Sequence, residues 1–379
     1  MRHRFLVHSP HQIDRLRRAG VNRVTIDLTR GSDVTPPDRT APNSARPGGA
    51  HPLAELTSAM TSLPLRDLEQ ELTSAERARE QLTHTVRRLY AHLQSSGTID
   101  SGEAAEAVRE IMIVTRTLTD PAVFWAMSQA RHTDPALSTH ALVTCTLSLI
   151  MGQGIGLGLT DLQDLATGAL LHDLGLVGMS RKILARLNNT SRIMPRQDLA
   201  IYQAHSREGA IRIERQRRFS HSVRRIVAEH HALPNGRGFP QEADPTATTR
   251  MSRIVMIADR YDDLLTGFGG ATPLAPHDAI QRLYMESQEQ SLDLTLTSLF
   301  IKRVGVFPVY SLVVLNTGER AVVTEINEEA LHLPVIHVTH NATGQALSLP
   351  TRIDLARQDR EHPNRSVARV LDSARPKKL

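Results

Sequence analysis

Apolar residues recur at helical spacing through most of the middle of the chain. From about residue 102 to residue 302, segment after segment places apolar side chains three and four positions apart, with short connections between the segments. This pattern predicts an all-α domain over residues 102–302. Residues 64–96 also carry Leu, Ala and Val at helical spacing among many charges, which predicts a long exposed helix within a helical connector over residues 54–101.

The two ends of the chain follow other patterns. Residues 1–30 are typical of a short helix followed by a strand, and residues 31–53 have the Pro- and Gly-rich composition of a linker. After the helical domain, apolar and polar residues alternate around a turn at Asn316–Glu319, which predicts a β-hairpin in a small β extension over residues 303–350. Residues 351–379 are expected to form a basic tail. The predicted fold is mainly α, a helical bundle with a small N-terminal α/β part and a short C-terminal β appendage.

Composition narrows the class of protein. The single cysteine, Cys145, rules out an internal disulfide and a thiolate zinc site, which fits a cytoplasmic location. No window approaches the ~18 uninterrupted apolar residues of a membrane span, so no membrane partner is expected. The net charge is +5, but 40 acidic residues are interleaved with the basic ones and aromatics make up only 3%. We therefore do not expect a nucleic-acid partner.

Three predicted helices carry an apolar stripe that ends in titratable residues. The stripe within Leu162–Leu170 leads to His172 and Asp173, that of Val223–Val227 to His230 and His231, and that of Met251–Ala258 to Asp259. A lone histidine on an apolar face is usually a satisfied core residue. Five buried titratable groups on three helices would each need a partner, because an unpaired buried charge costs several kcal/mol.

A pair of divalent cations would satisfy these groups together. Imidazole and carboxylate ligands suit Fe, Mn, Zn or similar ions, and the adjacent His-Asp and His-His pairs suit two ions bridged by the aspartate. Two further histidines have a fitting placement. His140 lies at the start of an apolar helix, and His205 lies three residues after Tyr202 and four before Gly209.

The order of these residues resembles the HD-GYP family, a branch of the HD phosphohydrolases. The segment LLHDLG contains His172 and Asp173, NGRGFP spans residues 235–240, and RIVMIADRYDDLL spans residues 253–265. The match covers about residues 130–270 and implies that the helical bundle is of the HD type. Residues 1–30 look like the second half of a small domain that often precedes such modules. The resemblance implies a metal-ligand set of His140, His172, Asp173, His205, His230, His231 and Asp259.

The resemblance also implies an activity. The family members are phosphodiesterases that hydrolyse cyclic di-GMP to pGpG, GMP or both, through a hydroxide that bridges two divalent ions. Asp173 and His172 would then be catalytic. The loop would contact the substrate through Asn235, Gly236, Gly238, Phe239 and Pro240. Partners implied are GGDEF-type or other signalling proteins, and residues 64–96 could support a homodimer.

The chain departs from the family pattern at several positions. Leu176 replaces the lysine that follows the HD pair, and Asn235 and Phe239 replace an aspartate and a tyrosine of the loop. A leucine cannot contact a substrate phosphate, so activity could be impaired. An alternative is therefore a metal-loaded cyclic di-GMP receptor or protein-interaction scaffold. A third hypothesis is a general HD nucleotidase that acts on nucleoside phosphates. It is disfavoured, because the NGRGFP loop and the His230–His231 pair follow the HD-GYP pattern.

Overall fold

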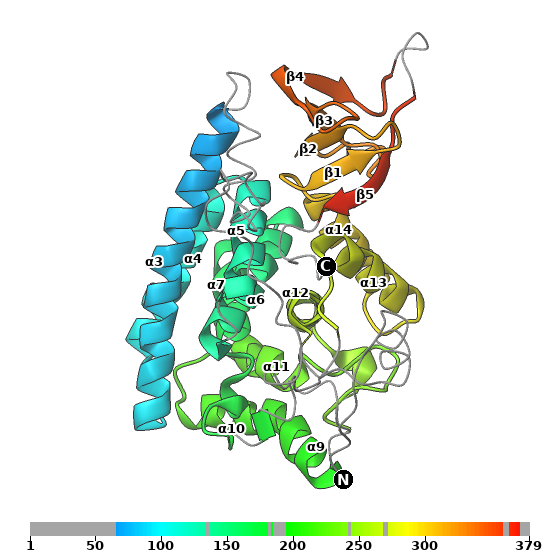
Figure 1. Ribbon diagram of the computed structural model, residues 1–379. Coiled ribbons are helices and arrows are strands. Elements are labelled where there is room, and N and C mark those ends of the chain that lie inside the picture. Colours follow the sequence, from blue (N-terminus) through cyan, green and yellow to red (C-terminus); the bar gives the residue numbers. More distant parts are fainter. Residues whose placement is uncertain are drawn as a thin grey trace, which may run out of the picture. The chain divides into compact units, whose positions relative to one another are not determined.

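The computed structural model describes residues 66–133, 136–180, 183–184, 195–241, 244–267, 272–358 and 364–371. In these ranges the chain is helical up to Val304, and its strands begin at Leu312 (Figure 1). The predicted mainly α fold with a short C-terminal β part is confirmed. The predicted N-terminal α/β part and the predicted linker, residues 1–53, lie outside the described residues.

The helices follow one another with short connections, as the apolar spacing predicts. They are α3 (Arg66–Ser96), α4 (Ser101–Thr117), α5 (Asp120–Thr133), α6 (Leu137–Gly154), α7 (Leu159–Leu171), the 3₁₀ turn η2 (Leu174–Leu176), α9 (Arg196–Gln203), α10 (His205–Arg215), α11 (His221–Glu229), the 3₁₀ turn η3 (Pro245–Ala247), α12 (Arg250–Thr266), α13 (Pro276–Gln288) and α14 (Leu294–Val304). Among the described helices, none combines the length and the apolar character that crossing a bilayer requires.

Helix α6 is the central helix of the bundle. Its side chains from Ser138 to Gly152 are buried, because the helix is apolar or small on all sides and α3, α5, α7 and α12 pack around it. Gly152 faces Leu165 of α7 so closely that a Cβ there would lie 2.6 Å from the leucine side chain. This close packing holds the last turn of α6 against the first half of α7.

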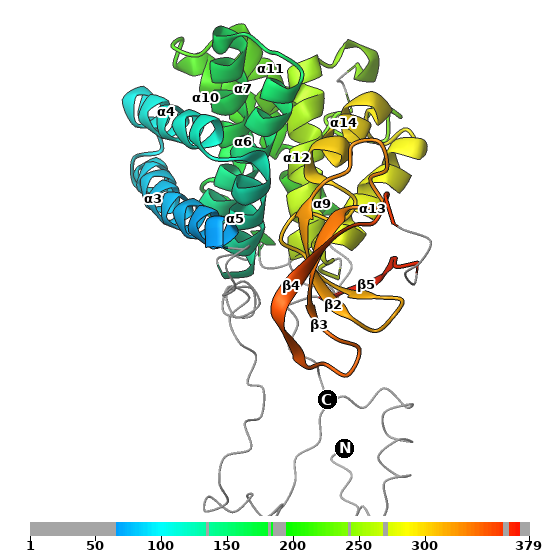
Figure 2. The ribbon, with the colours of Figure 1, turned by 90° about the horizontal axis from the view of Figure 1, so that it is seen from above.

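Helix α3 lies at the edge of the bundle beside α4 (Figures 1 and 2). The prediction of an exposed helix is correct for only one of its faces. Leu72, Leu82 and Leu89 are each about 1% exposed and belong to the main hydrophobic core of the bundle. The helix within the predicted connector is thus an integral part of the helical core.

The strands form one five-stranded antiparallel sheet (Figure 2). They are β1 (Leu312–Leu315), β2 (Arg320–Glu325), β3 (Val335–His340), β4 (Ala346–Asp354) and β5 (Val367–Leu371), in the order β4-β3-β2-β1-β5. The predicted hairpin is confirmed, since β1 pairs with β2 and Val313 lies opposite Ala321. Alternating side chains of the sheet, including Val323 and Ile336, form a second, smaller core.

The tail predicted over residues 351–379 needs correction. Strand β4 continues to Asp354, and β5 pairs with β1, with Val370 opposite Val313. The β5 sequence VARVL is short and lies among basic residues, so its alternation is weak by itself. It becomes a strand because the free edge of β1 offers unpaired backbone groups to it.

Candidate metal centre

The residues predicted to bind metal lie at the ends or in the middle of five helices. Helix α6 provides one from its first turn, α7 two from its carboxyl end, α10 its first residue, α11 the two residues that follow it, and α12 one from its middle. In chain order these are His140, His172, Asp173, His205, His230, His231 and Asp259. The side chain of His231 is 17% exposed, and the other six are 8% exposed or less.

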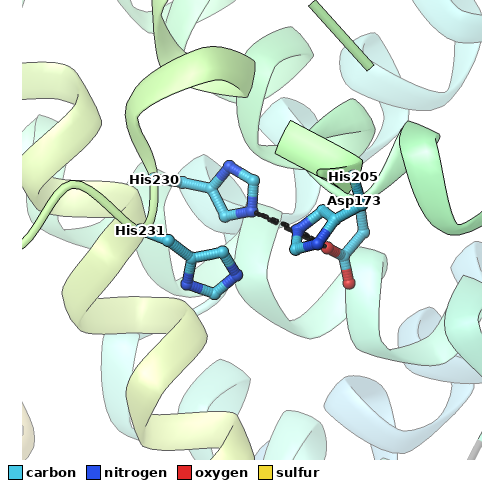
Figure 3. Close-up of side chains that lie close together, drawn as sticks. All are labelled: Asp173, His205, His230 and His231. Atoms are coloured by element: carbon cyan, nitrogen blue, oxygen red, sulfur yellow. Dashed lines mark hydrogen bonds and ion pairs between the residues drawn. The ribbon is translucent and has the colours of Figure 1, made fainter. Parts of the chain in front are cut away.

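The structure brings these side chains together in two groups that share Asp173. Asp173, His205, His230 and His231 each offer one ligand atom within 4.8 Å of the others (Figure 3). His140, His172 and Asp173 meet the same condition. A third group of His140, Asp259 and Asp263 adjoins them.

The two oxygens of Asp173 face different groups. Its Oδ1 is 3.1 Å from Nε2 of His205 and 3.7 Å from Nε2 of His230. Its Oδ2 is 3.5 Å from Nε2 of both His140 and His172. A carboxylate in this position can contribute one oxygen to each of two cations.

Asp259 also lies between the groups. Its Oδ1 is 3.1 Å from Nε2 of His140, and its Oδ2 is 3.8 Å from Nδ1 of His231. The two carboxylates come from different helices, because Asp173 follows α7 and Asp259 lies within α12. Both contact the same cluster of imidazoles. Together they supply two negative charges to the cluster of imidazoles.

Hydrogen bonds set the orientation of four of the histidine rings. Nδ1 of His172 donates to the carbonyl oxygen of Ala169 at 2.7 Å, and Nδ1 of His205 donates to that of Tyr202 at 2.6 Å. Nδ1 of His230 donates in the same way to Val227 at 2.9 Å, while Nδ1 of His140 is 2.6 Å from Oδ2 of Asp262. Since a carbonyl oxygen only accepts, Nδ1 carries a proton in the first three rings, and Nε2 offers a lone pair to a metal ion whenever such a ring is neutral. Such bonds typically orient metal-ligating histidines.

The lone pairs of these rings face one another. Nε2 of His140 is 3.0 Å from Nε2 of His172, and Nε2 of His205 is 3.1 Å from Nε2 of His230. Two acceptor nitrogens at this separation repel each other unless a cation lies between or beside them. The donor set of imidazoles and carboxylates fits Fe, Mn, Zn or a similar divalent ion.

The charges of the cluster favour the ligand forms of Asp173, His230 and His231. Burial acts to lower the pKa of His140 and His172, but hydrogen bonds to Asp259 and Asp262 raise that of His140 well above its usual value, and the charge of Asp173 raises that of His172. Burial acts to raise the pKa of Asp173, but the charge of His172 and the hydrogen bonds of His205 and His230 hold it well below its usual range. Burial lowers the pKa of His230 and, together with the neighbouring His230, holds that of His231 well below its usual value. An ionised carboxylate and neutral imidazoles are the forms that bind a metal ion.

The turn after α7 is held by α10. A Cβ on Gly175 would lie 2.0 Å from the carbonyl oxygen of His205, so only glycine allows the two backbones to approach this closely. Nη1 of Arg212 donates to the carbonyl oxygens of Leu174 at 3.2 Å and Val177 at 3.0 Å. Leu176, in the same turn, is 2% exposed.

The loop residues predicted to contact substrate have different surroundings. The ring of Phe239 lies beside that of His231, with 4.4 Å between their centroids. Gly238 packs against the His231 carbonyl oxygen, which a Cβ there would approach to 2.0 Å, and Gly236 is exposed with φ +73°. The amide nitrogen of Asn235 donates to Ser291 at 2.9 Å. Pro240 is half-buried next to Phe239, and the role of all five stays a prediction.

Two residues of the site were missed by the sequence analysis. Asp262 is fully buried and holds the ring of His140, and Asp263 adjoins Asp259. Burial, followed by the charge of Asp259, raises the pKa of Asp263 well above its usual range. The signal was present in RYDDLL, because Asp262 and Asp263 follow Asp259 by three and four residues and so share its helix face.

Comparison with known proteins shows similarity over most of the chain. The model described as an HD domain matches residues 125–296, and a model described as a domain of unknown function, DUF3391, matches residues 1–104. The chain is 24% identical over 354 residues to the cyclic di-GMP phosphodiesterase PA4108 of Pseudomonas aeruginosa, which covers 93% of this chain and 82% of that protein. The solved structure of Bd1817, described as a HDG"Y"P protein from Bdellovibrio bacteriovorus, has a TM-score of 0.50 at 21% identity and covers 65% of this chain and 76% of that one. The likeness to Bd1817 concerns the fold, and the predicted HD-type resemblance is confirmed.

Proposed function

We propose that this chain, which carries an HD domain and resembles HD-GYP proteins, is a metal-dependent phosphodiesterase that hydrolyses cyclic di-GMP to pGpG, GMP or both. The observation that carries the proposal is the position of Asp173, whose two oxygens face two separate groups of imidazoles. The match to a cyclic di-GMP phosphodiesterase over most of both chains supports the substrate.

Two divalent ions, of Fe, Mn or Zn, fit the cluster. One would be held by Asp173, His205, His230 and His231, and the other by His140, His172, Asp173 and Asp259. Bound there, such ions lower the pKa of a water molecule and polarise phosphoryl oxygens. His172 and Asp173 are the proposed catalytic residues, because Asp173 is shared by the two groups and His172 lies next to it in the chain.

The side chains of this site have distinct tasks. The lowered pKa of Asp173 keeps this carboxylate ionised, so each of its oxygens can bind a cation. Ala169 fixes the ring of His172 through its carbonyl oxygen, and Asp262 fixes that of His140. The ring of Phe239 beside His231 offers an apolar face on which a guanine base could stack.

The loop residues complete the proposed substrate site. Gly238 lets the backbone of the loop approach His231, and Gly236 keeps the exposed turn free of a side chain. Together with Asn235, Phe239 and Pro240 they would contact the nucleotide. Contacts with GGDEF-type or other signalling proteins, and a homodimer, remain predictions of the resemblance.

Leu176 is the observation that favours a second candidate function, a catalytically impaired receptor or scaffold. Its side chain is buried and apolar, so it provides no charge for a substrate phosphate. Such a receptor would bind cyclic di-GMP and leave it intact. We favour the enzyme, because the chain retains every ligand of the two groups.

The experiment that tests the proposal is hydrolysis of cyclic di-GMP by protein purified without oxygen, with the products separated by chromatography. Wild-type protein is expected to release pGpG or GMP, and Asp173→Ala is expected to release neither. Asp161→Ala is the matched control, since Asp161 is an exposed aspartate at the start of the same helix. Nucleotide binding by the wild type with no product would contradict the enzyme and favour the receptor.

A further inference from the structure

The tyrosine hydroxyl of α3 reaches the end of the helix that carries the HD pair. Tyr90 is 3% exposed, and its Oη donates to the carbonyl oxygen of Leu170 at 2.8 Å. Leu170 lies in the last turn of α7, two residues before His172 and three before Asp173. The hydroxyl thus contacts the backbone directly next to both proposed catalytic residues.

This carbonyl is one that α7 cannot satisfy on its own. The last four carbonyl groups of a helix have no partner within the helix. In α7, the carbonyl oxygen of Ala169 accepts from Nδ1 of His172, and the next one accepts from Tyr90. Two consecutive carbonyls are therefore bonded to side chains, and one of these side chains is a proposed ligand. A shift of this turn would move the ring of His172 directly.

Helix α3 is also held at its opposite end. The carboxylate of Glu71 accepts from Oη of Tyr310 at 2.8 Å and from the hydroxyl of Thr119. One end of α3 thus contacts the segment that leads into the sheet, and the other end contacts the turn of His172 and Asp173. These bonds restrict sliding of α3 along its own axis.

We infer that Tyr90 is a positioning residue that holds the last turn of α7, and with it His172 and Asp173, in the geometry that binds metal. The inference rests on the proposed function, since it assumes that these residues are ligands. Helix α3 lies within residues 1–104, which match DUF3391. The segment that matches DUF3391 therefore contacts, through Tyr90, the turn that precedes two of the proposed ligands.

The test compares Tyr90→Phe with Tyr310→Phe. Both substitutions keep the ring and remove one buried hydroxyl bond, and Tyr310 is also 3% exposed. Metal-free protein is titrated with Mn²⁺, and the visible absorption of the Co²⁺-loaded protein reports the ligand geometry. Tyr90→Phe is expected to bind Mn²⁺ about tenfold more weakly and to change the Co²⁺ spectrum. With cyclic di-GMP, kcat is expected to fall about tenfold with KM unchanged.

Three outcomes would overturn the inference. The first is a Tyr90→Phe affinity and spectrum equal to those of Tyr310→Phe. The second is a Tyr90→Phe protein that binds Mn²⁺ more weakly and melts at a lower temperature without metal, but has an unchanged Co²⁺ spectrum. This result would mean that Tyr90 only stabilises the fold. The third is wild-type protein that binds no metal, which would refute the proposed function as well. Wild-type protein that binds Mn²⁺ but does not hydrolyse cyclic di-GMP would refute the proposed enzyme activity alone. The effect of Tyr90→Phe on the affinity for Mn²⁺ would then decide whether Tyr90 is a positioning residue.

Discussion

Gly175 and His205 pack backbone against backbone. An added Cβ at residue 175 would lie 2.0 Å from the carbonyl oxygen of His205 and 2.6 Å from its carbonyl carbon. Gly175 belongs to the turn that follows Asp173, and His205 begins α10. The contact therefore sets the distance between two proposed ligands that come from different helices.

Gly175→Ala is expected to separate the turn after α7 from α10. Both atoms that the methyl group would meet belong to the backbone, so no side chain can rotate to make room. We expect a loss of about 1–3 kcal/mol in the free energy of unfolding and loss of most metal binding. Chemical denaturation and Mn²⁺ titration measure the two effects.

Gly158→Ala is the matched control for this substitution. Gly158 precedes α7, has φ −67° and would have no heavy atom within 4 Å of an added Cβ. We expect its metal affinity to stay near that of the wild type. Equal metal affinity of Gly175→Ala and Gly158→Ala would refute the role of the close contact.

Asp262 is expected to strengthen metal binding through His140. Its Oδ2 is 2.6 Å from Nδ1 of His140, and its side chain is fully buried. Asp262→Asn keeps the shape and an acceptor oxygen but removes the negative charge. We expect the affinity for Mn²⁺ to fall about tenfold, as is typical when a hydrogen-bond partner of a ligand is changed. Calorimetric titration of metal-free protein measures the change.

Asp278→Asn serves as the control for the Asp262 experiment. Asp278 is an exposed aspartate in the first turn of α13, a helix that carries none of the proposed ligands. Its substitution is expected to leave the affinity within about twofold of the wild type. An Asp262→Asn affinity in that same range would argue against orientation of His140 by this carboxylate.

Glu286 is expected to contribute stability that depends on pH. It accepts from Arg260 at 2.8 and 2.7 Å and from Arg282 at 2.9 Å. Burial acts to raise its pKa, but the bonds from Arg260 and Arg282 lower it below the usual 4.5. Because the pKa is lower in the folded state, the contribution is full above about pH 4.5 and is lost as the pH falls through the folded-state pKa.

The measurement is the melting temperature of metal-free wild type and Glu286→Gln as a function of pH, so that metal release plays no part. At pH 7 we expect Glu286→Gln to melt about 2–6 °C below the wild type. The difference should shrink as the pH falls below the ordinary glutamate pKa. Glu289→Gln, an exposed position at the end of the same helix, should show no such trend. A difference that is constant with pH would refute the charge contribution of Glu286.

The sequence predicts the helical part of this molecule well because its apolar stripes are long and end at the site. The stripe of α7 places His172 and Asp173 at the core end of the helix, and the structure has them there. Strand β5 could not be predicted, since five residues acquire strand structure only by pairing with β1.

The surroundings of the proposed ligands were partly predictable. Asp262 follows Asp259 by three residues, so helical spacing alone places the two on one face. The bond between Tyr90 and Leu170 joins residues that are 80 positions apart in the chain. No local pattern contains such a pairing, and only the packing of α3 on the bundle determines it.

The measurement that tests the central claim most directly is hydrolysis of cyclic di-GMP by chelator-stripped protein during stepwise addition of Mn²⁺. We predict no turnover without metal, and turnover that rises and saturates at about two ions per chain, as expected for two groups of ligands that share Asp173. Bound metal is counted on the same samples. Full turnover by protein that retains no metal would contradict the account.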